Sequence, residues 1–513
     1  MKYNKARGFC ALLAAVMLAG CSSGGGQQVS IADFGGSGGV DYSDSVQQNL
    51  PDMASQEEPT AEPTHTLPAQ ETSETSAEEP EQTTAPAQAT ETSAQTTKPQ
   101  TTTATSGSSV TSVTTAETTV KTTPAQTTTE APVEIPEHDF GSSAYTALNY
   151  SEVKGVWISY IELAEILTGQ SRESFRSNIG KVFDNCVNLG INTVYVHVRS
   201  HGDAYYRSEL FPWSKYVTGT LGSDPGFDPL EIMLNEAHSR NLSFHAWINP
   251  LRTCTTSQIS SYGSYPVYSF ATAAGTSGKY AVDVNGTYYL NPAYEEVTEL
   301  IAAGAAEIVA NYDVDGLHID DYFYPTTDAS FDSSAYSSSG YSSLSDFRFA
   351  NCDRMVSGIY SAVKSANPSA LFSVSVQGRI DNNYNQLYAD VRKWCTSPGY
   401  LDVIIPQIYY GFENSAAPYQ VTLDEWESLA SAGGIPLIAG LSVSKVGEED
   451  KWAGSGKNEW INDHDIISRQ TAAAKKCSSY GGIALYSYRS IFSPDPSVSS
   501  AVSEEISALK DIL

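Results

Sequence analysis

The chain has 513 residues, 41% of them hydrophobic, and carries 59 Asp and Glu against 29 Lys and Arg, for a formal net charge of −30. This length and apolar content suffice for one large folded core. The acidic balance, with no basic stripe along the sequence, argues against a nucleic-acid partner.

The first 20 residues have the pattern of a secretory signal peptide. Three basic residues among the first seven precede an apolar run over residues 10–18, which is too short to span a bilayer. The next residues, Leu18-Ala19-Gly20-Cys21, resemble a lipobox, which implies that Cys21 becomes a lipidated N-terminus. An ordinary cleaved signal with an incidental cysteine is the alternative. We therefore expect an extracytoplasmic protein, lipid-anchored to the cell membrane, at the cell surface or in the cell wall.

Residues 21–140 are expected to form a disordered stalk. Thr, Ser, Pro, Glu, Gln and Ala dominate this segment, and it has almost no aliphatic periodicity, so it cannot build a core. Residues 22–150 hold 18 acidic residues and two lysines, which is 16 of the 30 net negative charges. Charge repulsion and proline favour an extended tether for the domain expected over residues 150–513.

Strand-like runs alternate with helical patterns eight times from Lys154 onward. Repeated βα units require a parallel sheet, and eight units with long loops after the strands favour a closed (β/α)8 TIM barrel over an open sheet. No GxGxxG turn follows the first strand, which disfavours dinucleotide binding. The predicted strands are Gly155–Tyr160, Asn192–Arg199, Leu242–Asn249, Gly316–Asp321, Leu371–Gln377, Asp402–Tyr409, Pro436–Ser442 and Gly482–Tyr488.

Local signals place several helix ends and one hairpin. Ser171–Leu189 is a predicted helix that ends at Gly190, and Asp228-Pro229 is a predicted helix start. Lys279–Leu290 is expected to form a hairpin that turns at Asn285-Gly286. The five cysteines of this domain are odd in number and lack CxxC spacing, so they predict neither a disulfide framework nor a zinc site.

Several predicted strands carry apolar residues on one parity and polar or aromatic residues on the other. Barrel interiors are usually filled by Val, Ile and Leu, so an inward polar set at the C-terminal strand ends indicates a catalytic site. The inward-facing residues predicted for that end are His197, Arg199, His245, Trp247, Asn249, His318, Asp320, Gln377, Gln407 and Tyr409.

The fourth predicted strand ends on two carboxylates, Asp320 and Asp321. Leu317 and Ile319 alternate with His318 and Asp320, which places Asp320 on the inner face. Burying a carboxylate costs several kcal/mol unless it is paired, and chains tolerate that cost mainly at functional positions. The alternative is a structural Asp that caps the next helix.

The motifs that carry a family resemblance lie between Lys154 and Arg489, and they are GVWISY, NTVYVHVRSHGDAYYRSELFPWSKYVTG, EAHSRNLSFHAWINPLR, DGLHIDDYFYP, QGRIDNNYN and YLDVIIPQIYYGFEN. With these motifs the chain resembles the bacterial glycosyl hydrolase-like family 10, envelope lipoproteins of the YngK type. The resemblance implies a TIM-barrel glycoside hydrolase of the cell envelope that acts on a polysaccharide, with peptidoglycan glycan strands favoured. For this reading we expect no cofactor and no metal.

DGLHIDDYFYP is also similar to the DGxDxDxEYP strand of chitinase-like barrels. Asp315 and Asp320 match two of its acids, whereas His318 replaces the middle Asp and Tyr322 stands where the catalytic Glu should be. The proton-donating acid must then come from another position, or the mechanism must differ.

Glycoside cleavage needs two carboxyl groups, about 5–5.5 Å apart for retention and about 6.5–9.5 Å apart for inversion. We predict Asp320 as nucleophile or stabiliser and either Asp321 or Glu413, in the loop after the sixth strand, as the acid. The predicted substrate-binding residues are His197, Arg199, Asp203, His245, Trp247, Asn249, Arg252, His318, Gln377, Asn383, Gln407, Tyr409 and Tyr410.

Two other functions stay open at this point. His197, His245 and His318, with Asp320, could support a metal-dependent deacetylase or hydrolase, although the first strand lacks the HxH pair common in such barrels. The chain could also be a catalytically inactive surface lipoprotein that binds peptidoglycan.

Overall fold

In the computed structural model of the protein, residues 138–320 and 323–513 are described. The expected signal peptide, the expected lipidation site Cys21 and the expected stalk up to residue 137 lie outside these residues, and so does Asp321. Within the described ranges, none of the helices combines the length and the apolar character needed to cross a membrane.

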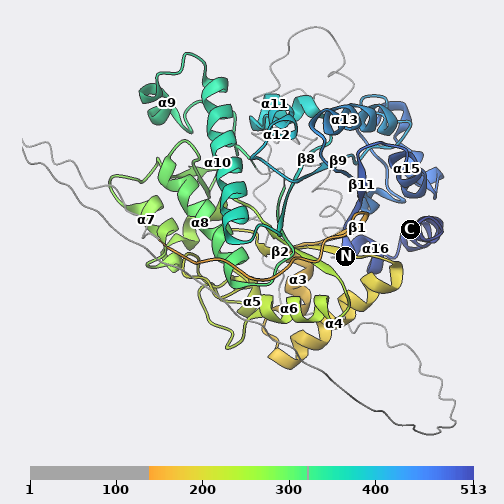
Figure 1. The fold of residues 1–513 in the computed structure, drawn as a ribbon, viewed down its shortest axis with the longest axis horizontal. Helices are drawn as coiled ribbons and strands as arrows, with labels where there is room; N and C mark the ends of the chain where they lie inside the picture. The colour runs from red at the N-terminus through yellow and green to blue at the C-terminus, as the bar shows by residue number, and fades with distance from the viewer. Residues whose placement is uncertain (1–137, 321–322) are drawn as a thin grey trace, which may run out of the picture. The chain divides into compact units, whose positions relative to one another are not determined.

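Eight parallel strands close into a barrel, in the order β1, β2, β3, β7, β8, β9, β10 and β11, with β11 again beside β1 (Figure 1). The predicted TIM barrel is therefore confirmed, and each predicted strand corresponds to one of these strands. Their bounds are β1 (Val153–Ile158), β2 (Thr193–Arg199), β3 (Ser243–Ile248), β7 (Gly316–Ile319), β8 (Leu371–Gln377), β9 (Val403–Gln407), β10 (Leu437–Ser442) and β11 (Tyr480–Tyr486).

Helices surround the strands and connect them (Figure 1). The longest of them, α4, α8, α10 and α13, lie between consecutive barrel strands, as βα units require. The helices have the bounds α3 (Tyr160–Leu167), α4 (Arg172–Leu189), α5 (Lys215–Thr218), α6 (Pro229–His238), α7 (Pro266–Thr272), α8 (Glu295–Asn311), α9 (Ser333–Ser339), α10 (Leu344–Ala366), α11 (Ile380–Leu387), α12 (Val391–Thr396), α13 (Tyr419–Gly433), α14 (Glu459–Asn462), α15 (Ile466–Ala474), α16 (Tyr488–Phe492) and α17 (Ser499–Lys510).

The predicted helix ends are confirmed. Gly190 ends α4 with a φ of 95°, a left-handed conformation that a residue with a Cβ rarely adopts. Asp228 begins α6 by accepting hydrogen bonds from the backbone N–H groups of Leu230 and Glu231, and Pro229 follows it as the first helical residue. These local signals work because they satisfy backbone groups that the helix itself cannot pair.

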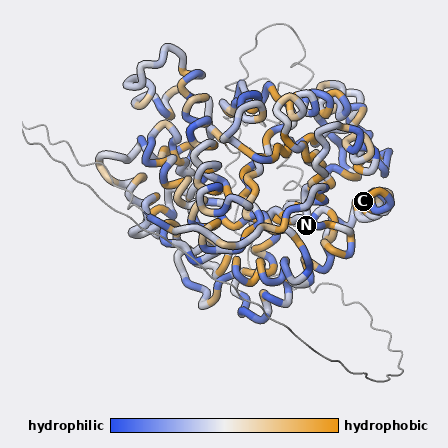
Figure 2. Tube along the Cα trace, in the orientation of Figure 1, coloured by the Kyte–Doolittle hydropathy of each residue, from blue (hydrophilic) through white to orange (hydrophobic). Residues whose placement is uncertain are grey.

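The hydrophobic core has two layers, and the hydrophobic stretches of the chain gather along the central strands (Figure 2). The larger layer packs the outward strand residues, such as Val194, Val196 and Val198, against the helices. The smaller layer has the opposite strand parity and therefore lies inside the barrel. It consists of Val153, Trp157, Tyr195, Trp247, Val403, Ile405, Ile438 and Ala484. Inside this part of the chain all five cysteines are free thiols, and four are buried.

A small antiparallel sheet follows β3. The predicted hairpin is confirmed as β5 (Ala281–Val284) paired with β6 (Thr287–Leu290). Asn285 and Gly286 join them with φ values of 54° and 90°, as a two-residue type I′ turn requires. A third strand, β4 (Arg252–Thr255), pairs with β6 and was not predicted. This pairing fixes the chain immediately after β3, where Arg252 lies.

Candidate functional site

Asp320 follows the last residue of β7, at the C-terminal end of the barrel, where active sites of this fold lie. Its side chain is buried, and its Oδ1 accepts a hydrogen bond of 2.5 Å from Nδ2 of Asn249. Asn249 follows β3, the strand that pairs with β7. Asp320 thus lies beside the C-terminal end of β3, the third predicted strand, as expected.

Two donors fix the orientation of the Asn249 side chain. Its Oδ1 lies 2.9 Å from Nη2 of Arg252 and 3.0 Å from Nε2 of His197. A guanidinium can only donate, so this atom must be the amide oxygen, and the amide nitrogen must point at Asp320. The carboxylate therefore receives a hydrogen bond from a group whose direction is set by its neighbours.

Arg252 is itself immobilised. Its Nε and Nη2 donate to the backbone carbonyl of Ser200 over 2.9 and 2.8 Å. Its guanidinium lies 5.6 Å from the centre of the Tyr160 ring, and the side chain is buried. This arrangement keeps a positive charge close to Asn249 while the guanidinium stays out of bulk solvent.

His197 is held as a neutral imidazole. Its Nδ1 accepts from the backbone N–H of Tyr160 at 3.3 Å, so Nε2 carries the proton that is donated to Asn249. Burial and the nearby charge of Arg252 hold the pKa of His197 well below its usual value. The ring stacks on Trp247 with centroids 3.3 Å apart. His197 and Trp247 therefore form a rigid, uncharged layer beside Asn249.

His318 and His245 lie deeper in the barrel. Trp157 Nε1 donates to Nε2 of His318 at 3.0 Å, which leaves Nδ1–H to donate to Ser373 Oγ at 2.8 Å. His245 lies against Gly316, where any Cβ would collide with the imidazole ring. Burial lowers the pKa of His245 to about 4 and that of His318 well below its usual value. Both are neutral interior residues beneath the Asp320 layer.

The histidines do not converge as metal ligands. Both ring nitrogens of His197 and of His318 face protein groups. Over residues 138–320 and 323–513, no cluster of three or more His, Cys, Asp or Glu side chains is arranged to hold a metal ion. The donor geometry of these residues therefore suits hydrogen bonding within the protein.

The predicted inward orientation of Arg199 is wrong. The register of β2 against β3 shifts between His197 and Arg199, which aligns Arg199 with the outward-facing Ile248. The guanidinium lies 4.4 Å from the centre of the Phe211 ring and occupies the space that a Cβ at Gly304 of α8 would need. A bulge thus turns this charge away from the site.

Carboxamide and phenol groups from three further strands reach the C-terminal end. Gln377 and Gln407 are the last residues of β8 and β9, and Nε2 of Gln407 lies 3.3 Å from Oγ of Ser375. Tyr409 stacks on Tyr486, the last residue of β11, with centroids 5.9 Å apart. These positions agree with the predicted strand parity.

Asn383 and Tyr410 support loops. Asn383 is fully buried, and its amide accepts from the backbone N–H of Gln377 and donates to the carbonyls of Gln377 and Arg379. Tyr410 packs in the outer core, with its ring against Gly378. These two predicted substrate-binding residues therefore lie where they hold the loops after β8 and β9.

The other predicted acids differ in environment. Asp203, in the loop after β2, is 3% exposed, and burial raises its pKa to about 6 although Ser214, Lys215 and Arg252 oppose the shift. Glu413 is exposed, and its backbone N–H donates to the Glu459 carboxylate at 2.8 Å. Only Asp320 of these acids contacts Asn249 in the part of the chain that is described.

Glu162 is a buried acid that the strand analysis missed. Its carboxylate accepts from Oγ of Ser487 at 2.6 Å and from the backbone N–H groups of Arg489 and Ser159, which joins the loops after β1 and β11. Burial raises its pKa. The sequence does contain a capping box, Ser159 to Glu162, but it gives no sign of the link to Ser487.

Asp315, at the opposite end of β7, has a structural environment. Its fully buried carboxylate accepts from the N–H groups of Leu148 and Phe244 and from the Tyr145 hydroxyl, and it lies 2.9 Å from Nε2 of His238. The two matches to the chitinase-like motif, Asp315 and Asp320, thus lie at opposite ends of one strand.

Comparison with known proteins agrees with this architecture. Residues 152–455 match the family described as Glycosyl hydrolase-like 10. The chain is 32% identical over 349 residues to Glycosyl hydrolase YngK of Bacillus subtilis, covering 63% of this chain and 67% of that protein. It is 31% identical over 339 residues to Glycosyl hydrolase DigH of Escherichia coli K12, covering 60% and 77%.

A more remote likeness is to a solved structure, the PgaB (BpsB) glycoside hydrolase domain from Bordetella bronchiseptica. The identity is 13% and the TM-score 0.46, covering 70% of this chain and 98% of that one. The sequence matches are the ones that establish kinship, since they extend over most of the barrel. By these matches the chain belongs to the glycosyl hydrolase-like 10 family.

Proposed function

We propose that this protein is a cell-envelope glycoside hydrolase that cleaves glycosidic bonds in peptidoglycan glycan strands. Family membership and two relatives named glycosyl hydrolases support a glycosidase and a polysaccharide substrate. The lipobox-like Leu18–Cys21 segment and the stalk composition support the envelope location and a membrane anchor through Cys21. No cofactor enters the proposal.

The contact between Asp320 and Asn249 carries the mechanistic part of the proposal. A carboxylate beside the anomeric carbon stabilises an oxocarbenium-like transition state or attacks it as a nucleophile. Asn249, oriented by Arg252 and His197, donates a hydrogen bond to Oδ1 of Asp320 and so holds this side chain in a fixed position for that role. Such fixed donors are effective because they need not reorganise during the reaction.

The second carboxyl group is assigned to Asp321 or Glu413, as the strand-end position of one and the loop position of the other suggest. Sugar hydroxyl groups would meet the carboxamides of Gln377 and Gln407, and pyranose faces would pack on aromatic rings such as Tyr409. The strands that supply these groups follow β7 around the barrel, since β8 pairs with β7 and β9 pairs with β8.

The test is digestion of purified sacculi, and of glycan strands freed of stem peptides, with products identified by mass. We expect new reducing ends from the wild-type protein and a loss of about 10³-fold or more in rate for Asp320→Asn, with an unchanged melting temperature. Glu425→Gln, an exposed acid on α13, is the matched control and should cleave normally.

Other products would point to other functions. Release of acetate without new reducing ends, abolished by a chelator, would support a metal-dependent deacetylase. Binding of glycan strands without any cleavage by the wild-type protein would support an inactive wall-binding lipoprotein. Full activity of Asp320→Asn would reject the assignment of Asp320.

A further inference from the structure

The loop that leads away from Asp320 has no regular secondary structure. Residues 323–332 connect β7 to α9 and contain neither helix nor strand. Phe323, Tyr324, Thr326 and Asp332 within it are nevertheless buried. A buried irregular segment has backbone carbonyls that cannot pair with a neighbouring strand, so it depends on side chains for its hydrogen bonds.

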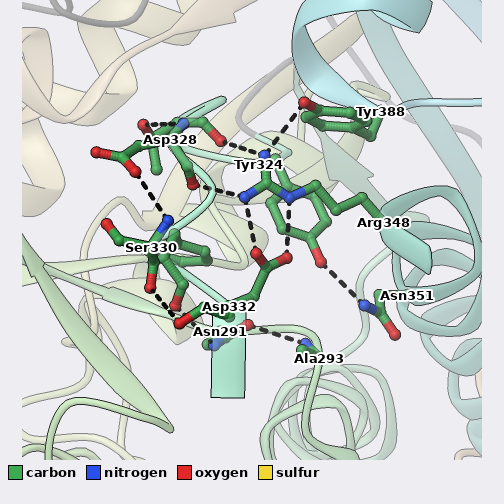
Figure 3. Close-up of polar contacts among 12 residues, drawn as sticks. Asn291, Ala293, Tyr324, Asp328, Ser330, Asp332, Arg348, Asn351 and Tyr388 are labelled. Carbon is green, nitrogen blue, oxygen red and sulfur yellow. Dashed lines mark hydrogen bonds and ion pairs between the residues drawn. The ribbon is translucent and has the colours of Figure 1, made fainter. Parts of the chain in front are cut away.

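Arg348, on the first turns of α10, supplies those hydrogen bonds (Figure 3). Its Nη2 donates to the carbonyl of Asp328 at 2.6 Å, and its Nη1 donates to that of Thr326 at 3.3 Å. Its Nε and Nη2 also bind the two carboxylate oxygens of Asp332 at 2.9 and 2.7 Å. One planar guanidinium therefore fixes three points of the loop, a geometry that a lysine could not reproduce.

The same guanidinium reaches the C-terminal end of α11, the helix that follows β8. Its Nη1 donates to the hydroxyl of Tyr388 at 3.1 Å, and the guanidinium carbon lies 4.9 Å from the centre of that ring and 5.1 Å from that of Tyr324. Tyr388 has a φ of 52°, a left-handed conformation that is uncommon for a residue with a Cβ. Tyr324 donates its backbone N–H to the carbonyl of Leu387 at 3.4 Å. Arg348 thus joins the segment that follows Asp320 to the C-terminal end of α11, the helix whose Asn383 side chain binds the backbone of Gln377.

The pair of Arg348 and Asp332 is completely buried, with both side chains 0% exposed. A buried ion pair gains little net stability, because desolvation offsets most of its attraction, and well-packed apolar residues of similar volume often serve equally well. What apolar residues could not supply is the set of directional bonds to the loop carbonyls. The cluster is therefore better explained by the geometry that it imposes than by its contribution to folding.

We propose that Arg348 is a positioning residue for glycan hydrolysis. It fixes the segment after β7 and the end of α11, whose Asn383 binds the backbone of Gln377, and thereby holds the Asp320 carboxylate and the Gln377 carboxamide in a constant relation. The inference rests on the proposed function for its catalytic part, whereas the immobilisation of residues 323–332 is independent of any substrate.

The experiment compares the full chain with three variants. Arg348→Met/Asp332→Leu removes the anchor without leaving a buried unpaired charge, so that folding is retained. Arg348→Lys keeps the positive charge but loses the planar set of hydrogen-bond donors that the guanidinium provides. Arg240→Met is the control, since Arg240 also binds two acids, Asp184 and Glu236, but next to α6 and α4. Amide hydrogen exchange is read for residues 323–332 and for the barrel strands, and kcat and KM are read on peptide-free glycan strands.

We expect exchange in residues 323–332 to rise about tenfold or more in the double variant while the strands keep their protection. We expect kcat to fall about 10²-fold with little change in KM, Arg348→Lys to recover part of this loss, and Arg240→Met to match the wild type. Unchanged exchange in the loop, or faster exchange with unchanged kcat, would overturn the proposal. A wild-type protein that cleaves no glycan would instead refute the proposed function and the catalytic part of this inference with it.

Discussion

Arg252 influences two acids. Through Asn249 it orients the donor to Asp320, and its positive charge also opposes the rise in the pKa of Asp203. Burial is the larger influence on Asp203 and brings its pKa to about 6. Asp203 therefore changes its charge near pH 6, and that change alters the electric field at Arg252.

We predict that Asp203 shapes the acid limb of the pH profile. Above about pH 6 the ionised Asp203 attracts Arg252, and below it the neutral form does not, so kcat/KM of the wild type should fall as the pH drops through about 6. Asp203→Asn should show lower activity and a flatter acid limb. The measurement is kcat/KM on peptide-free glycan from about pH 4.5 to about pH 8, with Asp224→Asn as the exposed control. An acid limb that stays the same in Asp203→Asn would contradict the prediction.

Single residues were predictable where strand parity decided their direction. Asn249, Gln377 and Asp320 keep the alternation of their strands and reach the C-terminal end as expected. Arg199 breaks it, because the bulge after His197 inserts a residue into the ladder and reverses the parity. A bulge of this kind depends on the partner strand and on the packing of Gly304, neither of which a local pattern contains.

Among the elements, α17 contacts α15 through a buried acid. Glu505 is fully buried, and its carboxylate accepts from the N–H groups of Ile466 and Ile467 at the start of α15 over 3.1 and 2.5 Å. Burial raises its pKa to about 7 in spite of these hydrogen bonds. The last helix is thus joined to its neighbour through a group that titrates near neutrality.

The sign of the resulting pH dependence follows from proton binding. The folded chain holds a proton on Glu505 up to about pH 7, whereas an ordinary Glu releases it near 4.5. The stability contribution is therefore fully present below about pH 4.5 and is lost as the pH rises through about 7. Compared with Glu505→Gln, the wild type should lose up to about 3 kcal/mol of unfolding free energy over this range. Urea unfolding of both proteins at several pH values measures it, and parallel curves would contradict it.

The elements themselves were predictable to different degrees. The helix starting at Pro229 and the hairpin at Asn285 follow from residues that satisfy backbone groups or adopt positive φ, so their signals are local. β4 is different, because its residues, Arg252–Thr255, become a strand only by pairing with β6 some 30 residues later. The irregular loop anchored by Arg348 is equally non-local, and no sequence pattern indicated that contact.

At the scale of the whole molecule, the two ends of β7 carry acids with different roles. The C-terminal ends of barrel strands carry catalytic residues, while the N-terminal ends mainly secure the fold. Asp320 has one oxygen directed by Asn249 at the first kind of end. Asp315 lies at the second kind, where it joins the segment before β1 to β3 and α6 through Tyr145, Phe244 and His238.

Substitutions at these two ends should therefore have opposite effects. Asp315→Asn puts an amide nitrogen against groups that donate, and the loss of several charged hydrogen bonds in a buried site should cost about 3 kcal/mol or more of unfolding free energy. Asp315→Asn leaves the C-terminal strand ends that form the site unchanged. Its kcat/KM, measured well below the melting temperature, should therefore stay within about threefold of the wild-type value. Asp320→Asn should instead keep the unfolding free energy and lose the activity. Denaturant unfolding and glycan cleavage of both variants decide the matter, and a loss of activity in folded Asp315→Asn would show that the two ends are not separable.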